Sequence, residues 1–182
     1  HRVELYEKNE KLGKKLYITG KGRCNLTNAC DRDTLFDNIV SNNKFFYHAY
    51  SELSNYDTID FFERLGLPLK VERGDRVFPI SDKSSDVIAA LKKELERLGV
   101  AINLGCEVSD IIIKDGAFSA IRLKPGNRTV SGDAVIIATG GLSYPVTGST
   151  GDGYEFARSI GHIVTKLTPS LVPLIVSEPF VK

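Results

Sequence analysis

The chain has no methionine and no tryptophan, and its 182 residues include only three cysteines. Cys24, Cys30 and Cys106 match neither a C-x-x-C redox pair nor a zinc pattern, and they are too few for a secreted disulfide framework. No apolar run approaches the ~18 residues of a membrane span, and no signal peptide opens the sequence. A charge surplus is also lacking, since 24 Lys and Arg face 23 Asp and Glu. We therefore expect a soluble, cytoplasmic protein with no metal site and with neither nucleic acid nor membrane as partner.

Hydrophobic residues make up 42% of the chain and charged residues 26%, which is typical of a folded globular domain. Apolar residues recur at helical spacing in three regions, and each region is followed by a glycine, namely Gly66, Gly99 and Gly161. Residues 84–86 supply N-cap candidates for the second region, and Asp152 supplies one for the third. The sequence therefore predicts helices within residues 43–65, 84–98 and 152–160.

Strand-like segments alternate with these helices. An Arg-Gly-Asp turn signal at residues 73–75 separates two short apolar segments and predicts a β-hairpin. The continuous apolar run at residues 134–138 is typical of a parallel strand covered on both faces, so we expect its branched side chains to be inaccessible to solvent. The mixture of helices, strands and a meander indicates a layered α/β fold. The predicted strands are residues 3–6, 69–71, 76–78, 100–102, 107–113, 117–123, 129–130 and 134–138.

Two glycine-rich regions are candidates for ligand binding. Gly-Lys-Gly-Arg-Cys-Asn at residues 20–25 lacks the third glycine of G-x-G-x-x-G, so it is not the dinucleotide fingerprint, although its backbone and basic side chains could approach a phosphate. Ala-Thr-Gly-Gly at residues 138–141 ends the apolar run, where ligands of open α/β sheets bind. Residues 148–153 follow closely and lead into a helix N-terminus, which favours anions. Together they indicate a shared ligand.

The chain resembles one flavoprotein family, the FAD-dependent oxidoreductases of the YhiN and BaiN type, which are aminoacetone oxidase-like. The resemblance covers essentially the whole chain, and its most specific block is residues 20–25. It implies a three-layer, glutathione-reductase-like FAD/NAD(P)-binding domain of the Rossmann type with a β-meander, truncated before its N-terminal GxGxxG turn and before its C-terminal part. We therefore expect residues 1–169 to form an incomplete FAD-binding domain and residues 170–182 to begin an inserted β-rich domain. The resembling blocks are residues 6–15, 19–28, 76–79 with 84–87, and 138–141 through 150–154.

The resemblance also implies which residues bind the cofactor. Glu7, one residue beyond a predicted strand, would accept the ribose hydroxyls; without the resemblance its position favours a solvated surface acid. The backbone of Val108 would lie against the adenine. The pyrophosphate and flavin side would be lined by Lys15, Gly22, Arg23 and Asn25. The strand-exit turn over the cofactor would be formed by Ala138, Thr139, Gly140 and Gly141, and the helix facing the flavin would begin with Asp152 and Gly153.

The implied activity is hydride transfer through FAD to or from a small molecule that the sequence does not identify, with NAD(P)H as an admissible electron donor. Neither a catalytic residue nor an oligomeric state follows from the sequence. Two alternatives stay open. The lack of an N-terminal glycine motif favours a non-catalytic nucleotide-binding or interaction domain. Thr-Gly-Asp-Gly at residues 150–153 favours a fumarate-reductase-like dehydrogenase, although residues 20–25 fit the first family better.

Overall fold

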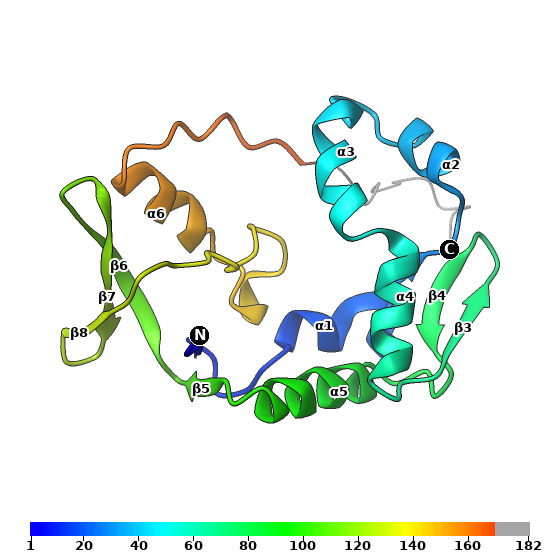
Figure 1. The fold of residues 1–182 in the computed structure, drawn as a ribbon, viewed down its shortest axis with the longest axis horizontal. Coiled ribbons are helices and arrows are strands. Elements are labelled where there is room, and N and C mark those ends of the chain that lie inside the picture. Colours follow the sequence, from blue (N-terminus) through cyan, green and yellow to red (C-terminus); the bar gives the residue numbers. More distant parts are fainter. Residues whose placement is uncertain (170–182) are drawn as a thin grey trace, which may run out of the picture.

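The computed structural model describes residues 1–169. Two groups of elements lie at opposite ends of the long axis, and helices α1 (Lys14–Ile18) and α5 (Ser84–Arg97) lie between them (Figure 1). One end holds an antiparallel meander and α6 (Asp152–Ser159), whereas the other holds a small sheet and three helices. The β-rich domain expected to begin at residue 170 lies outside the described residues.

A short parallel pair of strands supports the Rossmann-type prediction. Strand β1 (Glu4–Glu7) pairs with β5 (Ala101–Leu104), so that Glu4 lies opposite Ala101 and Glu7 opposite Leu104. Parallel strands require a long crossover connection, and the connection here contains α5, which packs against α1. Both strands were predicted within two residues of their observed bounds, and the structure confirms an α/β fold with a parallel sheet.

The second sheet has the order β2–β4–β3 and contains the predicted hairpin. In the hairpin turn, Gly74 (φ +75°) and Asp75 (φ +56°) both adopt left-handed backbone conformations. Helix α4 contacts β2 and β3, and α5 contacts β4. The buried residues of this end include Cys24, Phe62 and Val87, which share one hydrophobic cluster. The elements are β2 (Thr27–Asn28), β3 (Leu69–Glu72), β4 (Arg76–Pro79), α2 (Arg32–Asp37), α3 (Asn43–Glu52) and α4 (Asn55–Arg64).

Helix α4 begins as its sequence dictates, but α5 and α6 do not begin at the predicted caps. Ser54 and Asp57 form a reciprocal capping box at the start of α4. The N-caps of α5 and α6 are instead Lys83 and Gly151, so Ser84 and Asp152 lie inside the first turns. Both predicted caps have other partners: the Ser84 hydroxyl donates to the Tyr17 carbonyl at 2.9 Å, and the Asp152 carboxylate accepts from Lys8.

The meander is an antiparallel sheet in chain order, as predicted. It consists of β6 (Glu107–Lys114), β7 (Ala117–Lys124) and β8 (Arg128–Ser131). Its buried side chains include Ile111, Ala120, Ile121 and Leu123. Strand β6 also contacts β1 and α6, so the meander is attached to the parallel pair and to the last helix.

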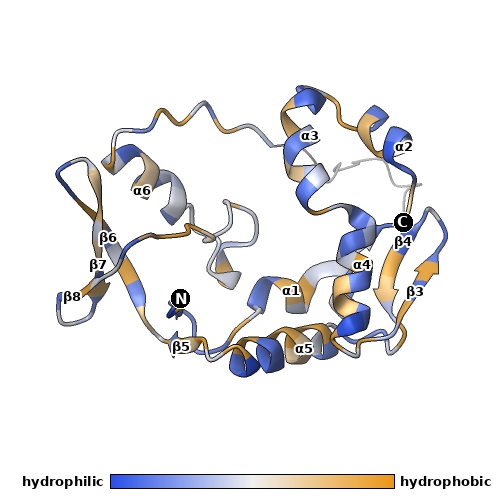
Figure 2. Ribbon diagram, viewed as in Figure 1, coloured by the Kyte–Doolittle hydropathy of each residue, from blue (hydrophilic) through white to orange (hydrophobic). Residues whose placement is uncertain are grey.

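The predicted buried strand at residues 134–138 is wrong. The segment is extended but belongs to no sheet of the described residues, and Val135, Ile136 and Ile137 are 38%, 91% and 39% exposed. Figure 2 shows the hydrophobic colouring of this ribbon between β8 and α6. The physical reason is that an apolar run becomes a buried strand only where a neighbouring backbone pairs with it, and within residues 1–169 β1 and β5 pair with each other and with no third strand.

Candidate functional site

Glu7 and Asn9 form a local hydrogen-bonded pair at the carboxyl end of β1. The Oε1 atom of Glu7 accepts both the backbone N–H of Asn9 at 2.8 Å and its Nδ2 amide at 2.7 Å. The same Nδ2 donates to the carbonyl of Thr147 at 3.1 Å. Within residues 1–169, no donor reaches the second carboxylate oxygen of Glu7, Oε2. Glu7, a half-buried acid, therefore has one oxygen held by Asn9 and one without a donor in this part of the chain.

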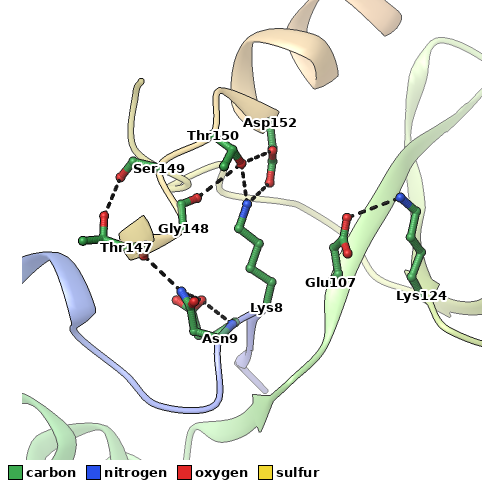
Figure 3. Close-up of polar contacts among 10 residues, drawn as sticks. Lys8, Asn9, Glu107, Lys124, Thr147, Gly148, Ser149, Thr150 and Asp152 are labelled. Atoms are coloured by element: carbon green, nitrogen blue, oxygen red, sulfur yellow. Dashed lines mark hydrogen bonds and ion pairs between the residues drawn. The ribbon is translucent and has the colours of Figure 1, made fainter. Parts of the chain in front are cut away.

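Lys8 connects this strand end to the N-terminus of α6. Figure 3 shows its side chain directed at Thr150 and Asp152, with Nζ 2.5 Å from Thr150 Oγ1 and 2.7 Å from Asp152 Oδ2. Thr150 also donates to Asp152 Oδ1 at 2.7 Å. Partial burial raises the pKa of the Asp152 carboxyl, but the hydrogen bonds from Lys8 and Thr150 together outweigh burial and hold that pKa below its ordinary value. Both oxygens of Asp152 thus have partners within the chain.

The turn of residues 138–141 packs closely against the start of α6 because both are rich in glycine. A Cβ on Gly153 would lie 2.6 Å from the Oγ1 of Thr139, and one on Gly140 would lie 3.0 Å from the Oγ of Ser149. Gly140 also has a φ of +73°, which favours glycine. A Cβ on Gly141 would lie 3.3 Å from the Tyr154 hydroxyl. Residues Ala138 to Gly140 are nevertheless exposed.

Lys15, on α1, contacts the two residues that follow Leu142, just beyond the turn of residues 138–141. Its Nζ donates to the carbonyl of Ser143 at 2.5 Å and lies 4.8 Å from the ring centroid of Tyr144. The structure therefore brings together predicted site residues from three separate parts of the sequence. These residues are Glu7, Lys15, Ala138, Thr139, Gly140, Gly141, Asp152 and Gly153.

Arg23 lies with the hairpin sheet and is fully engaged there. Its guanidinium donates to Glu72 Oε1 at 2.5 Å and to Asp82 Oδ1 at 2.7 Å, and Lys70 donates to Asp82 Oδ2 at 2.6 Å. The hydrogen bonds from Arg23 and Lys70 hold the pKa of both carboxyls below their ordinary values. The four side chains carry no net charge, so this cluster offers no surplus positive charge to a phosphate.

The two neighbours of Arg23 in the predicted site also lie on this hairpin side. Gly22 has a φ of +86° and ends a 3₁₀ turn (Thr19–Gly22). Asn25, with its amide nitrogen facing the hairpin, donates to the carbonyls of Val77 at 3.2 Å and Thr27 at 3.1 Å. A Cβ on Gly20 would lie 2.9 Å from the backbone nitrogen of Asn25. These contacts fix the loop against β4.

Val108 and Cys24 occupy separate environments. Val108 lies on β6, opposite Leu123 of β7, and so belongs to the meander. Cys24 is 1% exposed, and burial raises the pKa of its thiol, which disfavours the reactive thiolate. In the described part of the chain, His, Cys, Asp and Glu side chains nowhere gather in a group of three that could hold a metal ion. Among residues 1–169, no helix combines the length and apolar composition needed to cross a bilayer.

Sequence reasoning missed Lys8 and Asn9. Each makes contacts with the segment around Gly148, whose absent side chain leaves room for them: a Cβ there would lie 2.6 Å from Asn9 Nδ2 and 3.3 Å from Lys8 Cε. The hydrophobic periodicity of the sequence says nothing about a polar residue beside a surface acid. The Lys8–Asp152 contact also joins residues 144 positions apart. Only the three-dimensional arrangement reveals these contacts.

Comparison with known proteins places the chain in a family. The description "HI0933-like protein Rossmann domain" matches residues 1–174. The chain is 34% identical over 182 residues to the 3-dehydro-bile acid delta(4,6)-reductase of Clostridium scindens, covering all of this chain and 43% of that protein. It is 28% identical over 181 residues to the ribosomal RNA dihydrouridine synthase of Escherichia coli, covering all of this chain and 44% of that protein. The chain thus spans less than half the length of these relatives.

Solved structures share the fold at low identity. Thermovibrio ammonificans THI4 superimposes with a TM-score of 0.52 and 10% identity, over 77% of this chain and 48% of that one. The Mycobacterium smegmatis Sdh1 complex in the apo form gives 0.52 and 18%, over 88% of this chain and 34% of that one. Because one relative is named for ribosomal RNA, the expectation that nucleic acid is no partner stays a prediction.

Proposed function

The chain belongs to the HI0933-like protein Rossmann domain family, and we propose from this premise that it forms part of the FAD site of a flavin-dependent oxidoreductase. A single observation carries the proposal: Glu7 ends a parallel strand, no donor within residues 1–169 reaches its Oε2, and its partner Asn9 contacts the loop that leads to Gly148. Ligands of α/β sheets bind beyond the carboxyl ends of strands, where an acid accepts ribose hydroxyls. A non-catalytic nucleotide-binding domain would use the same acid. The relatives of this chain, however, are named for the reactions that they catalyse.

The residues of the turn fit a dinucleotide. A pyrophosphate is bound best by backbone groups that no side chain shields, and Gly140 and Gly141 present such backbone beside Thr139. Lys15 and Lys8 add two cations near this turn, although both already have oxygen partners in the chain. We propose that Ala138 through Gly141 face the cofactor and that Asp152 and Gly153 hold the start of α6 against the turn.

Residues of the hairpin side have a supporting part in the proposal. Gly22 and Asn25 would face the flavin, and Arg23 would act by fixing their loop, because its charge is balanced by Glu72 and Asp82. The backbone of Val108 would lie against the adenine, since β6 contacts β1, the strand that carries Glu7. We also propose that residues 1–169 are the FAD-binding part and that residues 170–182 begin an inserted domain.

A bound flavin supplies hydride transfer, whereas this chain supplies binding and orientation. Glu7 would receive the adenosine hydroxyls, and the glycine turn would admit the phosphates. The names of the two relatives describe a reductase and the synthesis of dihydrouridine, the reduced form of uridine. We therefore propose reduction of an unsaturated small molecule, with NAD(P)H as electron donor, in the cytoplasm, where the free cysteines of the described part would stay reduced.

The test is whether the full-length protein purifies with FAD. We expect the visible absorbance of oxidised flavin and, after extraction, about one FAD per chain. Glu7→Ala should weaken FAD binding by roughly tenfold to a hundredfold, because the hydroxyls lose a charged acceptor. Glu52→Ala, which removes an exposed acid of α3, is the matched control and should leave binding unchanged. A colourless protein that takes up no added FAD would refute the proposal.

A further inference from the structure

Asn9 makes three hydrogen bonds that together orient the carboxylate of Glu7. Two of its donors, the backbone N–H and Nδ2, meet on Oε1 of Glu7, and Nδ2 also donates to the Thr147 carbonyl. Each carboxylate oxygen has two lone pairs, so both acceptor sites of Oε1 are filled from within the chain. The acceptor sites of Oε2 are the ones directed elsewhere.

The amide of Asn9 is itself held in place. Thr147 belongs to a 3₁₀ turn (Pro145–Thr147) and is buried, and its hydroxyl donates to the Tyr144 carbonyl at 2.7 Å. The next residue, Gly148, lies so close that a Cβ would approach Nδ2 to 2.6 Å. Figure 3 shows Asn9 directed at Thr147 on this loop. The amide thus bridges a fixed carbonyl and a carboxylate, which restricts the rotamers of Glu7.

A free glutamate at this position would lose side-chain entropy on binding a ligand. A glutamate that the fold already orients has lost that freedom during folding, so more of its hydrogen-bond energy appears as affinity. The geometry points to Asn9 as a positioning residue for recognition of a ribose hydroxyl by Glu7. We propose that Asn9, through Glu7, sets the preference of the site for ribose over deoxyribose. This inference rests on the proposed function, in which Glu7 receives the adenosine hydroxyls.

The test uses the apo form of the full-length protein and two probes, ADP and 2′-deoxy-ADP, in calorimetric titrations. Wild-type protein should bind ADP about tenfold more tightly or better, because one hydrogen bond to a charged acceptor is lost with the deoxy probe. Glu7→Ala should abolish this preference. Asn9→Ala should reduce it to about threefold or less, because only the backbone N–H of residue 9 then orients the carboxylate.

Asn103→Ala is the matched control. Asn103 lies on β5, and within residues 1–169 its amide donates to the backbone carbonyls of Leu5 at 3.3 Å and Ala101 at 3.4 Å and to no side chain. Its removal should leave the preference at the wild-type value. Thermal melts of every variant identify any that fail to fold, and Asn9→Asp, which keeps the size but loses the Nδ2 donor, provides a second variant at the same position.

The outcomes separate the inference from the proposed function. A protein that binds neither FAD nor ADP overturns the proposed function. If Glu7→Ala abolishes the preference but Asn9→Ala and Asn9→Asp keep it, the function stands and the inference is wrong. If Asn9→Ala weakens both probes by the same factor, Asn9 has only a structural role in the loop, and the inference is again overturned.

Discussion

The guanidinium carbon of Arg23 lies 4.1 Å from the ring centroid of Phe78, so a cation covers an aromatic ring of strand β4. The same guanidinium pairs with Glu72 and Asp82, and these contacts together join the loop of residues 19–25 to the hairpin. Cation–π contact and ion pairing act on the same side chain, which gives Arg23 one fixed orientation. Arg23 therefore links the most family-specific sequence block to the nearest sheet.

We predict that Arg23→Ala loosens this loop. The backbone N–H of Leu26, which donates to the Val77 carbonyl at 2.9 Å, should exchange its hydrogen faster in the variant, because the loop is then held by fewer contacts. The measurement is hydrogen exchange followed by mass spectrometry. Arg97→Ala removes an exposed pair with Glu94 on α5 and should leave exchange at Leu26 unchanged. Equal exchange in Arg23→Ala and wild type would contradict the prediction.

The same cluster predicts a pH dependence. The pKa values of Glu72 and Asp82 are lowered in the folded protein. The largest cause is the hydrogen bond from Arg23 for Glu72 and the hydrogen bond from Lys70 for Asp82. A lowered folded pKa gives stabilisation that is complete above the unfolded pKa of about 4 and is lost as the pH falls through the folded value. The difference in melting temperature between wild type and Asp82→Asn should therefore shrink as the pH is lowered below about 4. A difference that stays constant across that range would contradict the assignment.

Two phenylalanines on neighbouring helices should differ greatly in their effect on stability. Phe62 of α4 is 8% exposed and belongs to the hydrophobic cluster, whereas Phe45 of α3 is 92% exposed. Phe62→Ala should lower the free energy of unfolding by about 3–5 kcal/mol through lost burial and a cavity. Phe45→Ala should change it by less than about 0.5 kcal/mol. Urea unfolding of the full-length protein measures both, and similar losses would show that the packing is misassigned.

Gly148 and Gly161 provide a comparison of strain with and without a clash. Their φ values are +95° and +93°, so alanine is strained at both by about 1–2 kcal/mol. A Cβ on Gly161 meets nothing within 4 Å, but one on Gly148 would lie 2.6 Å from Asn9 Nδ2. Gly148→Ala should therefore destabilise the protein more than Gly161→Ala and should also lower ADP affinity. Thermal melts and ADP titrations check this, and equal effects of the two variants would exclude the clash.

The parts of the fold that local physics determines could be predicted from the sequence. The hairpin around Gly74 and Asp75 follows from adjacent residues, and the end of α4 follows from Gly66, whose φ is +80°. The five-residue helix α1 was not predicted, because its packing against α5 matters more than its propensity. The strand at residues 134–138 was wrong because pairing depends on a second backbone that periodicity cannot supply.

The site divides in the same way. Glu7 could be proposed as a site residue from the sequence because its place at the end of a strand has a known chemical meaning. Lys8 and Asn9 could not, because what they contact lies far along the chain, near Gly148 and Asp152. The predicted cap role of Asp152 was wrong for the same reason, since Lys8 rather than the helix backbone takes its carboxylate.

The Lys8–Asp152 contact has a consequence for the order of folding. It closes a loop of 144 residues, whereas the hairpin and the meander join residues that are close in sequence. Closure of a long loop loses conformational entropy before the contact contributes any stabilisation, so this pair should form after the folding transition state. Lys8→Ala should then accelerate unfolding while leaving the refolding rate nearly unchanged. The two chain segments of the candidate site would then come together late in folding.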